Sequence, residues 1–194
     1  MSHLFCADLH LGHSNILAHD QAPFATVKER EDAIYAALDS VLTPGDTLWN
    51  LGDVAWYESS LRRYIGFLRD REVSPVLVRG NHDDKAAWKF RDLFDASYEA
   101  TYQMFTVDGK QVGVYLSHYA HRTWRNSGRG SYHFYGHSHG KLPDFGRSTD
   151  VGVKPRNYTI PSLNELIKEL GDRPFGLNLQ IDGTGGRSNL GDDP

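Results

Sequence analysis

Carboxylate and imidazole side chains occur in this sequence in pairs that are two residues apart. Asp8 and His10 form one pair, and His137 and His139 form the other. In extended backbone, side chains two residues apart point to the same side, so each pair is predicted to direct both groups at one point. Two such pairs brought together would supply the ligands of a metal site.

Three further candidate ligands, Asp53, Asn81 and His118, each follow an apolar run that is predicted to be a strand. The fold would bring them to the same edge of the sheets as the two pairs. Oxygen and imidazole donors without a thiolate favour manganese, iron, zinc, cobalt or nickel over a structural cysteine-bound zinc. The single cysteine, Cys6, lies inside an apolar run and is expected to be unreactive.

Each of these motifs also has an ordinary structural explanation. Gly52-Asp53 is a common turn pair, and Gly80-Asn-His-Asp83 could be a turn with Asn81 in the left-handed conformation. The motifs nevertheless occur together in one chain, each after a predicted strand, and this combination favours a metal centre. Four other histidines lack such a context and are predicted to be surface or packing residues: His3, His19, His121 and His133.

The first half of the chain must position the earlier motifs, and its pattern predicts a βαβαβ order with a parallel sheet. In such sheets ligands collect beyond the carboxyl ends of the strands. Strands are predicted over residues 3–7, 46–51 and 73–79, with one helix from the Thr26 capping box to Pro44 and another over residues 58–71.

The second half has a different pattern. Residues 101–107 and 111–117 flank Asp108-Gly109-Lys110, which predicts a β-hairpin. Strands are predicted over 131–135 and 149–153, and a helix over 161–170. One domain is expected over residues 1–171, followed by a polar, glycine-rich tail over 172–194 that is expected to be poorly ordered.

Composition excludes several classes of protein. Hydrophobic residues make up 39% of the chain, and no apolar run approaches the roughly 20 residues of a membrane span. The N-terminus lacks the pattern of a signal peptide, so a cytoplasmic enzyme without a membrane partner is expected. The net charge of -4 gives no general case for polyanion binding, but residues 109–143 contain no acid and are locally basic.

The motifs Asp8-Leu-His10, Gly52-Asp53, Gly80-Asn-His-Asp83, His118 and Gly136-His-Ser-His139 resemble those of the calcineurin-like metallophosphoesterase superfamily. The opening segment from Phe5 to Ile16 is similar to that of its small single-domain bacterial and phage members. The resemblance covers residues 4–153 and implies an α/β fold. Two stacked mixed β-sheets flanked by helices, in a four-layer α/β/β/α sandwich, are therefore expected.

The resemblance also implies a role for each motif. Asp53 is expected to bridge two metal ions, His82 to act beside the substrate as proton donor, and Asp83 to hold the His82 imidazole. His121 lies close enough to His118 in the sequence to remain an alternative ligand. The expected ligands are Asp8, His10 and His139 for one ion, and Asn81, His118 and His137 for the other.

The chemistry implied is hydrolysis of a phosphomonoester or phosphodiester. Two divalent cations, manganese being expected and iron, zinc, cobalt or nickel being alternatives, can share a water at a separation of about 3.5 to 4 Å. The bridging hydroxide then attacks the phosphorus in line, and His82 protonates the leaving oxygen.

Residues around the ligands are expected to select the substrate. His13 and Asn15 follow the first ligand pair and either contact a substrate phosphate or shape their loop. The loop over residues 120–131 is expected to hang over the metals, with Arg122 as the direct phosphate contact. Aromatic residues near the motifs could stack a base, which favours a nucleotide or nucleic-acid substrate. They are Trp56, Tyr57, Tyr119 and Trp124.

The alternative function is a non-catalytic metal-binding scaffold that keeps the phosphoesterase fold for interaction with partners. Loss of the bridging ligand or of the proton donor would favour it, yet Asp53 and His82 are both present. A Ser-His-Asp hydrolase is disfavoured because the chain has no Gly-x-Ser-x-Gly motif. The pattern makes no prediction about the oligomeric state.

Overall fold

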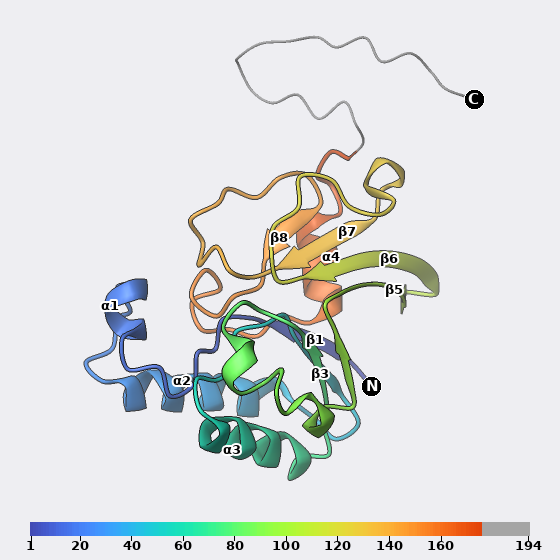
Figure 1. The fold of residues 1–194 in the computed structure, drawn as a ribbon. Helices are drawn as coiled ribbons and strands as arrows, with labels where there is room; N and C mark the ends of the chain where they lie inside the picture. Colours follow the sequence, from blue (N-terminus) through green and yellow to red (C-terminus); the bar gives the residue numbers. More distant parts are fainter. Residues whose placement is uncertain (176–194) are drawn as a thin grey trace.

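The computed structural model describes residues 1–175. These residues form two four-stranded sheets with flanking helices, which confirms the expected α/β class (Figure 1). The expectation of a poorly ordered tail concerns residues that, from 176 onward, lie outside the described part of the chain.

The first sheet is parallel throughout, with the strand order β1-β2-β3-β4. The second sheet has the order β5-β6-β7-β8 and is mixed, because β5 and β6 pair antiparallel and the other neighbours pair parallel. Only the second of the two sheets is therefore mixed. The strands are β1 (His3–Cys6), β2 (Thr47–Asn50), β3 (Ser74–Val78), β4 (Ala96–Tyr98), β5 (Ala100–Val107), β6 (Lys110–Ser117), β7 (Tyr132–Tyr135) and β8 (Ser148–Asp150).

Two of the α-helices begin at a side-chain cap. The Thr26 side chain accepts a hydrogen bond from the Glu29 amide, and Ser162 forms a capping box with Glu165. The α-helices are α1 (Ile16–Asp20), α2 (Val27–Val41), α3 (Glu58–Arg69) and α4 (Leu163–Leu170), and the 3₁₀ segments are η1 (Asp83–Lys85), η2 (Arg91–Leu93) and η3 (Ser127–Arg129).

The two faces of the first sheet lie in different hydrophobic cores. On β1, Leu4 and Cys6 pack with α2 and α3, whereas Phe5 points into the core between the sheets. There the Phe5 ring meets Phe134 of the second sheet edge to face, with centroids 5.0 Å apart. This core continues with leucines of α4. The alternation of strand side chains thus fixes which face of the first sheet packs on the helices and which packs on the second sheet.

Two elements were missed by the sequence pattern. Strand β4 has three half-buried residues, too few to give an alternating signal. Helix α1 has five residues and lacks a side-chain cap. The hairpin prediction is confirmed, since Asp108 and Gly109 both have positive φ, as a tight two-residue turn between β5 and β6 requires.

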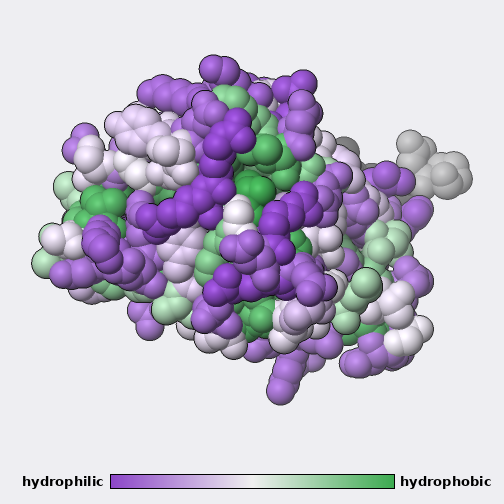
Figure 2. Space-filling view, turned by 90° about the horizontal axis from the view of Figure 1, so that it is seen from below, coloured by the Kyte–Doolittle hydropathy of each residue, from purple (hydrophilic) through white to green (hydrophobic). Residues whose placement is uncertain are grey.

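Seen from the side of α2 and α3, the surface is a mosaic of hydrophilic side chains with small hydrophobic patches between them (Figure 2). No helix among residues 1–175 is long and apolar enough to cross a bilayer.

Candidate metal centre

The seven expected ligands lie just beyond the carboxyl ends of β1, β2, β3, β6 and β7 or in the loops that follow. Five of them have left-handed backbone, a region that non-glycine residues adopt uncommonly. This differs from the extended spacing predicted for the two pairs, and a sharp bend after each strand is what turns the side chains inward. Such conformations cluster at functional sites. The five are Asp8 (φ 57°), His10 (φ 46°), Asp53 (φ 57°), His137 (φ 65°) and His139 (φ 50°).

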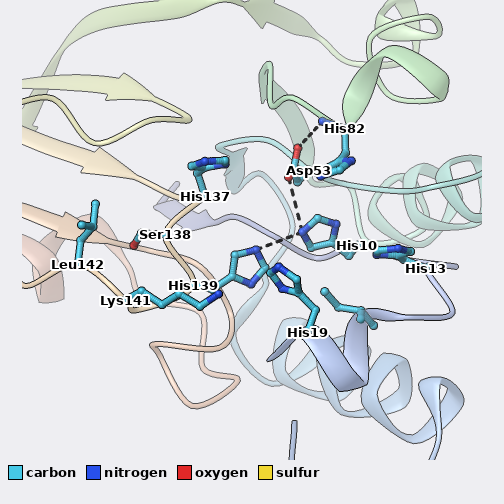
Figure 3. A pocket seen from close by; sticks show the side chains of 11 residues that line it. His10, His13, His19, Asp53, His82, His137, Ser138, His139, Lys141 and Leu142 are labelled. Carbon is cyan, nitrogen blue, oxygen red and sulfur yellow. Dashed lines mark hydrogen bonds and ion pairs between the residues drawn. The ribbon is translucent and has the colours of Figure 1, made fainter. Parts of the chain in front are cut away.

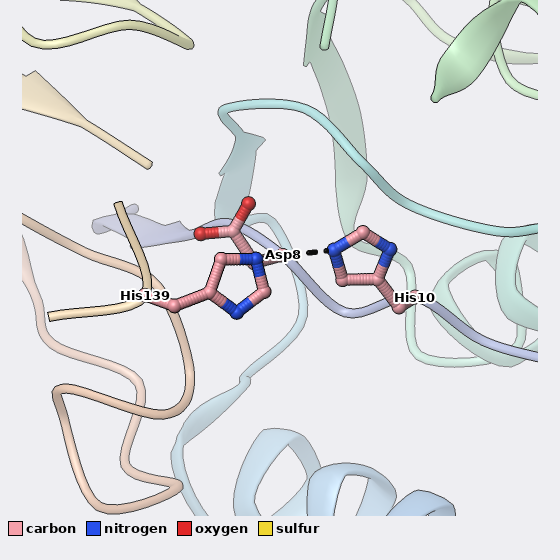
Figure 4. Close-up of side chains that lie close together, drawn as sticks. All are labelled: Asp8, His10 and His139. Atoms are coloured by element: carbon pink, nitrogen blue, oxygen red, sulfur yellow. Dashed lines mark hydrogen bonds between the residues drawn. The ribbon is translucent and has the colours of Figure 1, made fainter. Parts of the chain in front are cut away.

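One group of donors consists of Asp8, His10 and His139, all of which are buried (Figure 4). The Nε2 atoms of His10 and His139 lie 3.4 Å apart. The Asp8 carboxylate accepts the backbone N–H of His137, with N···O distances of 2.9 and 3.1 Å to its two oxygens. This hydrogen bond ties the loop after β7 to the loop after β1, and so brings the two sequence pairs together.

A second group of donors consists of Asp53, His118 and His137. The Nδ1–H of His118 donates to the Leu51 carbonyl at 2.7 Å, which leaves Nε2 free for another partner. That Nε2 lies 3.0 Å from Oδ1 of Asn81. The alternative ligand His121 instead lies edge to face on Tyr115, so the choice falls on His118.

A single carboxylate oxygen lies between the two groups. Oδ2 of Asp53 is 3.6 Å from Nε2 of His10 and 3.5 Å from Nε2 of His118. Buried lone-pair donors from the two groups lie close together, an arrangement that divalent cations would stabilise. The oxygen and imidazole donors suit such cations. The donors thus suit divalent metal ions, and the two groups contain members of both ligand sets that the resemblance implies.

The electrostatics of the site are strongly perturbed, as is common where chemistry occurs. Burial raises the pKa of Asp8 to about 7 and lowers that of His10 to about 3. Burial alone would raise the pKa of Asp53, but the hydrogen bond and charge of His118 outweigh it and lower the pKa to about 2. The reverse holds for His118, where burial is outweighed by Asp53 and the pKa rises to about 9.

Asp83 does not hold the imidazole of His82, so this expectation is corrected. Its carboxylate accepts hydrogen bonds from the backbone N–H groups of Asp53, Val54 and Gly80, at 3.0, 2.9 and 2.7 Å. These three hydrogen bonds occupy both carboxylate oxygens of the buried Asp83 side chain. Asp83 therefore fixes the two ligand loops after β2 and β3 to each other, and a side chain at Gly80 would collide with Asp53.

His82 lies beside the donor groups without joining either of them. Its backbone N–H donates to Oδ1 of Asp53 at 2.8 Å, and its ring centroid is 5.5 Å from that of His10. The imidazole lines the pocket, in a position to meet a substrate (Figure 3).

A pocket of about 550 Å³ opens over the donor groups (Figure 3). His13 lines it, whereas Asn15 and Arg122 are not among its lining residues. Other members of the lining were not expected: Ile16, His19, Lys141 and Leu142. Spacing gave no signal for them, because α1 and the turn after His139 are brought to the pocket only by the tertiary fold.

The arginines of residues 120–131 lie elsewhere. The Arg125 guanidinium is 4.7 Å from the centroid of the Tyr102 ring on β5, and Arg129 lines a different depression with Lys110. Trp124 packs against His133, so it is also not a free platform. Within the described chain, no residue of this loop lines the pocket over the metal ligands.

The two sheets bring buried carboxylate and imidazole donors together beyond their carboxyl ends, an arrangement that suits a metal-dependent enzyme. A family model for calcineurin-like phosphoesterases matches residues 1–141. The chain belongs to this family, and it is a metal-dependent hydrolase of phosphoric esters.

Related proteins extend the similarity to phage, archaea and bacteria. The Gene 66 protein of Mycobacterium phage L5 is 26% identical, over 71% of this chain and 77% of the phage protein. The uncharacterized protein MJ1445 of Methanocaldococcus jannaschii is 25% identical, over 84% of this chain and 87% of its own length. The crystal structure of AQ665, a protein of unknown function from Aquifex aeolicus, has a TM-score of 0.65 at 25% identity, covering 87% of this chain and 98% of AQ665.

Proposed function

We propose that this chain hydrolyses phosphoesters of the nucleotide or nucleic-acid type at a centre of two divalent metal ions. The observation that carries the proposal is the position of Asp53 Oδ2, about equally distant from His10 and His118. Asp53 would bridge the ions. The ion-specific ligands would be Asp8, His10 and His139 on one side, and Asn81, His118 and His137 on the other.

When bound, two such ions supply a water-derived nucleophile at neutral pH and neutralise the phosphoryl oxygens. His82 is the proton donor to the leaving oxygen, since its imidazole lines the pocket beside the ligands while its backbone N–H is anchored on Asp53. Asp83 acts through the backbone, by holding the loops that present Asp53 and His82.

Lys141 replaces Arg122 as the proposed phosphate contact, because it is the one Lys or Arg that lines the pocket in the described chain. Apolar Ile16 and Leu142 lie in the same lining. A leaving group with both an apolar face and additional negative charge matches such a surface, as a nucleotide does. Tyr119 is 49% exposed beside His137, with ring centroids 4.6 Å apart, and offers a face for a base.

The test is a screen of the protein against nitrophenyl phosphate, bis-nitrophenyl phosphate, cyclic nucleotides and short oligonucleotides. Metal content is measured on protein purified without chelator, and chelator should abolish hydrolysis that manganese or a related ion restores. Asp53→Ala should lose both metal and activity, whereas Asp32→Ala, an exposed carboxylate that pairs with Lys28, should lose neither. Full activity of metal-free protein would refute the proposal.

A further inference from the structure

We propose that Asp20 is a positioning residue that holds the imidazole of His139, and that the buried Arg30 couples this carboxylate to the loop carrying Asp8 and His10. The inference rests on the metal centre proposed above and adds residues outside the expected ligands. Neither Asp20 nor Arg30 was singled out by the motifs, because they lie in and after α1, where the sequence shows no ligand spacing.

The first observation is a contact across the site. Oδ1 of Asp20 lies 2.6 Å from Nδ1 of His139, and both side chains are buried. The contact is short but bent, because the oxygen lies off the direction of the ring N–H. A proton on Nδ1 leaves the Nε2 lone pair of His139 free to bind a metal ion. This Nε2 lies 3.4 Å from Nε2 of His10.

The second observation is a fully buried cation behind this pair. Arg30 on α2 donates from Nη1 to the Leu9 carbonyl at 2.6 Å and from Nη2 to the Asp8 carbonyl at 3.2 Å. The same Nη2 is 3.7 Å from Oδ2 of Asp20. One guanidinium therefore contacts both the loop after β1 and the carboxylate that faces His139.

A buried charge is costly unless it is paired, so this arrangement requires explanation. A chain of contacts runs from Arg30 through Asp20 to His139, which is protonated on Nδ1. This chain ends at the donor group Asp8, His10 and His139. The other donor group, around His118, is oriented by the Leu51 carbonyl instead.

The two metal positions should therefore depend on different supports. Removing the Asp20 carboxylate should weaken the ion held by Asp8, His10 and His139 and leave the ion near His118 unchanged. Outer partners of ligand histidines typically contribute on the order of 10- to 100-fold in metal affinity. The loss should be confined to one of two binding steps.

The experiment is a calorimetric titration of metal-free protein with manganese, comparing the parent with Asp20→Ala and Asp20→Asn. We expect Asp20→Ala to weaken one binding step by about 10- to 100-fold, and Asp20→Asn, whose amide oxygen can still accept from Nδ1–H, to restore part of the loss. Asp32→Ala removes an exposed carboxylate that pairs with Lys28, and as the matched control it should bind both ions like the parent. His19→Ala tests the alternative that His19, Asp20 and His139 hold an ion themselves, since these three side chains form a third donor group.

A second measurement needs neither metal nor activity. Nitrogen-15 spectra of metal-free protein should show His139 with its proton on Nδ1, assigned by the signal that His139→Gln removes, and Asp20→Ala should shift that tautomer balance. A parent protein that binds no metal defeats the proposed function but leaves this measurement intact. Equal binding by the parent and Asp20→Ala, or a proton on Nε2 in the parent, would overturn the positioning role. A loss in His19→Ala as large as in Asp20→Ala would also overturn it, by making these residues direct ligands.

Discussion

The imidazole of His13 stacks on the indole of Trp56, with ring centroids 4.3 Å apart and an interplanar angle of 8°. The Lys85 ammonium lies 3.9 Å from the centroid of the same indole. Trp56 is therefore occupied by the protein itself, and it supports His13 at the edge of the pocket instead of offering a platform to a base.

This relationship predicts the effect of Trp56→Leu. The variant should keep its metal and lose up to about tenfold in kcat/KM, equally for a nucleotide and for a nitrophenyl ester, because the loss acts through His13. Tyr119→Ala should instead affect the nucleotide more, by removing an exposed ring near the ligands. A loss for Trp56→Leu that is confined to nucleotides would restore the base-stacking role to this indole.

The His82 prediction separates proton donation from metal binding. His82→Ala should retain the metal content of the parent while its rate falls on the order of 10²- to 10⁴-fold. The fall should be smaller for a nitrophenyl ester, because that leaving group hardly needs a proton. Elemental analysis and steady-state kinetics check both parts, and metal loss as large as in His137→Ala would identify His82 as a ligand.

Lys141 and Arg122 form a matched pair of cations, one in the pocket and one outside it. Lys141→Ala should raise KM for a phosphoester with additional charge and reduce the dependence of kcat/KM on salt. Arg122→Ala should behave like the parent on both counts. The opposite ranking of the two variants would indicate that the arginine-containing loop contacts the substrate.

Asp83 is predicted to control both stability and metal binding. Asp83→Ala leaves three buried backbone N–H groups without their partner, at a cost of roughly 1 to 3 kcal/mol for each group that finds no substitute. Denaturant unfolding should show the loss, and metal titration should show weaker binding because Asp53 is displaced. Asp84→Ala, its exposed neighbour, serves as the control and should unfold like the parent.

Acid should destabilise the fold through His133, which is buried between Ser117 and Ser148. Burial lowers the pKa of His133 to about 3 from an unfolded value of 6.5. Above pH 6.5 the neutral ring keeps its full contribution to stability. As the pH falls from 6.5 toward 3, His133 binds a proton in the unfolded state but stays neutral in the folded state. The free energy of unfolding therefore decreases progressively over this range.

The measurement is the free energy of unfolding of metal-free protein as a function of pH. His133→Gln should be less stable at neutral pH and should lose less stability between pH 6.5 and 3 than the parent. His121→Gln should reduce the pH dependence only in part, because the charge of His121 is the smaller of the two causes that lower the pKa of His133. A parallel pH dependence in the parent and His133→Gln would contradict this account.

The fold class and the clustering of the expected ligands could be predicted from the sequence, because strand periodicity and motif spacing are local. Asp53 and His118 could be placed at strand ends from the apolar runs before them. The residues that line the pocket could not be predicted from local sequence. His19 and Lys141 reach the site only when α1 and the turn after β7 fold against it. Arg122 was misjudged for the same reason, since closeness to His118 along the chain does not set the direction of a loop.

Roles that depend on backbone contacts were also beyond prediction. The motif suggested that Asp83 orients its neighbour His82, yet the Asp83 carboxylate accepts hydrogen bonds from three backbone amides in two separate loops. His133 was predicted to be a surface or packing residue, and the structure shows that it is completely buried.

The two sheets are consecutive in the chain, and the passage from β4 to β5 at Glu99 divides the ligands between them. Asp8, Asp53 and Asn81 precede that residue, and the ligand histidines from His118 onward follow it. Because domains emerge from the ribosome N-terminal end first, a growing chain carries only part of the centre until His139 has been added. Synthesis thus delays the hydrolytic capacity of the nascent polypeptide until strand β7 of the second sheet and the two histidines that follow it have been joined.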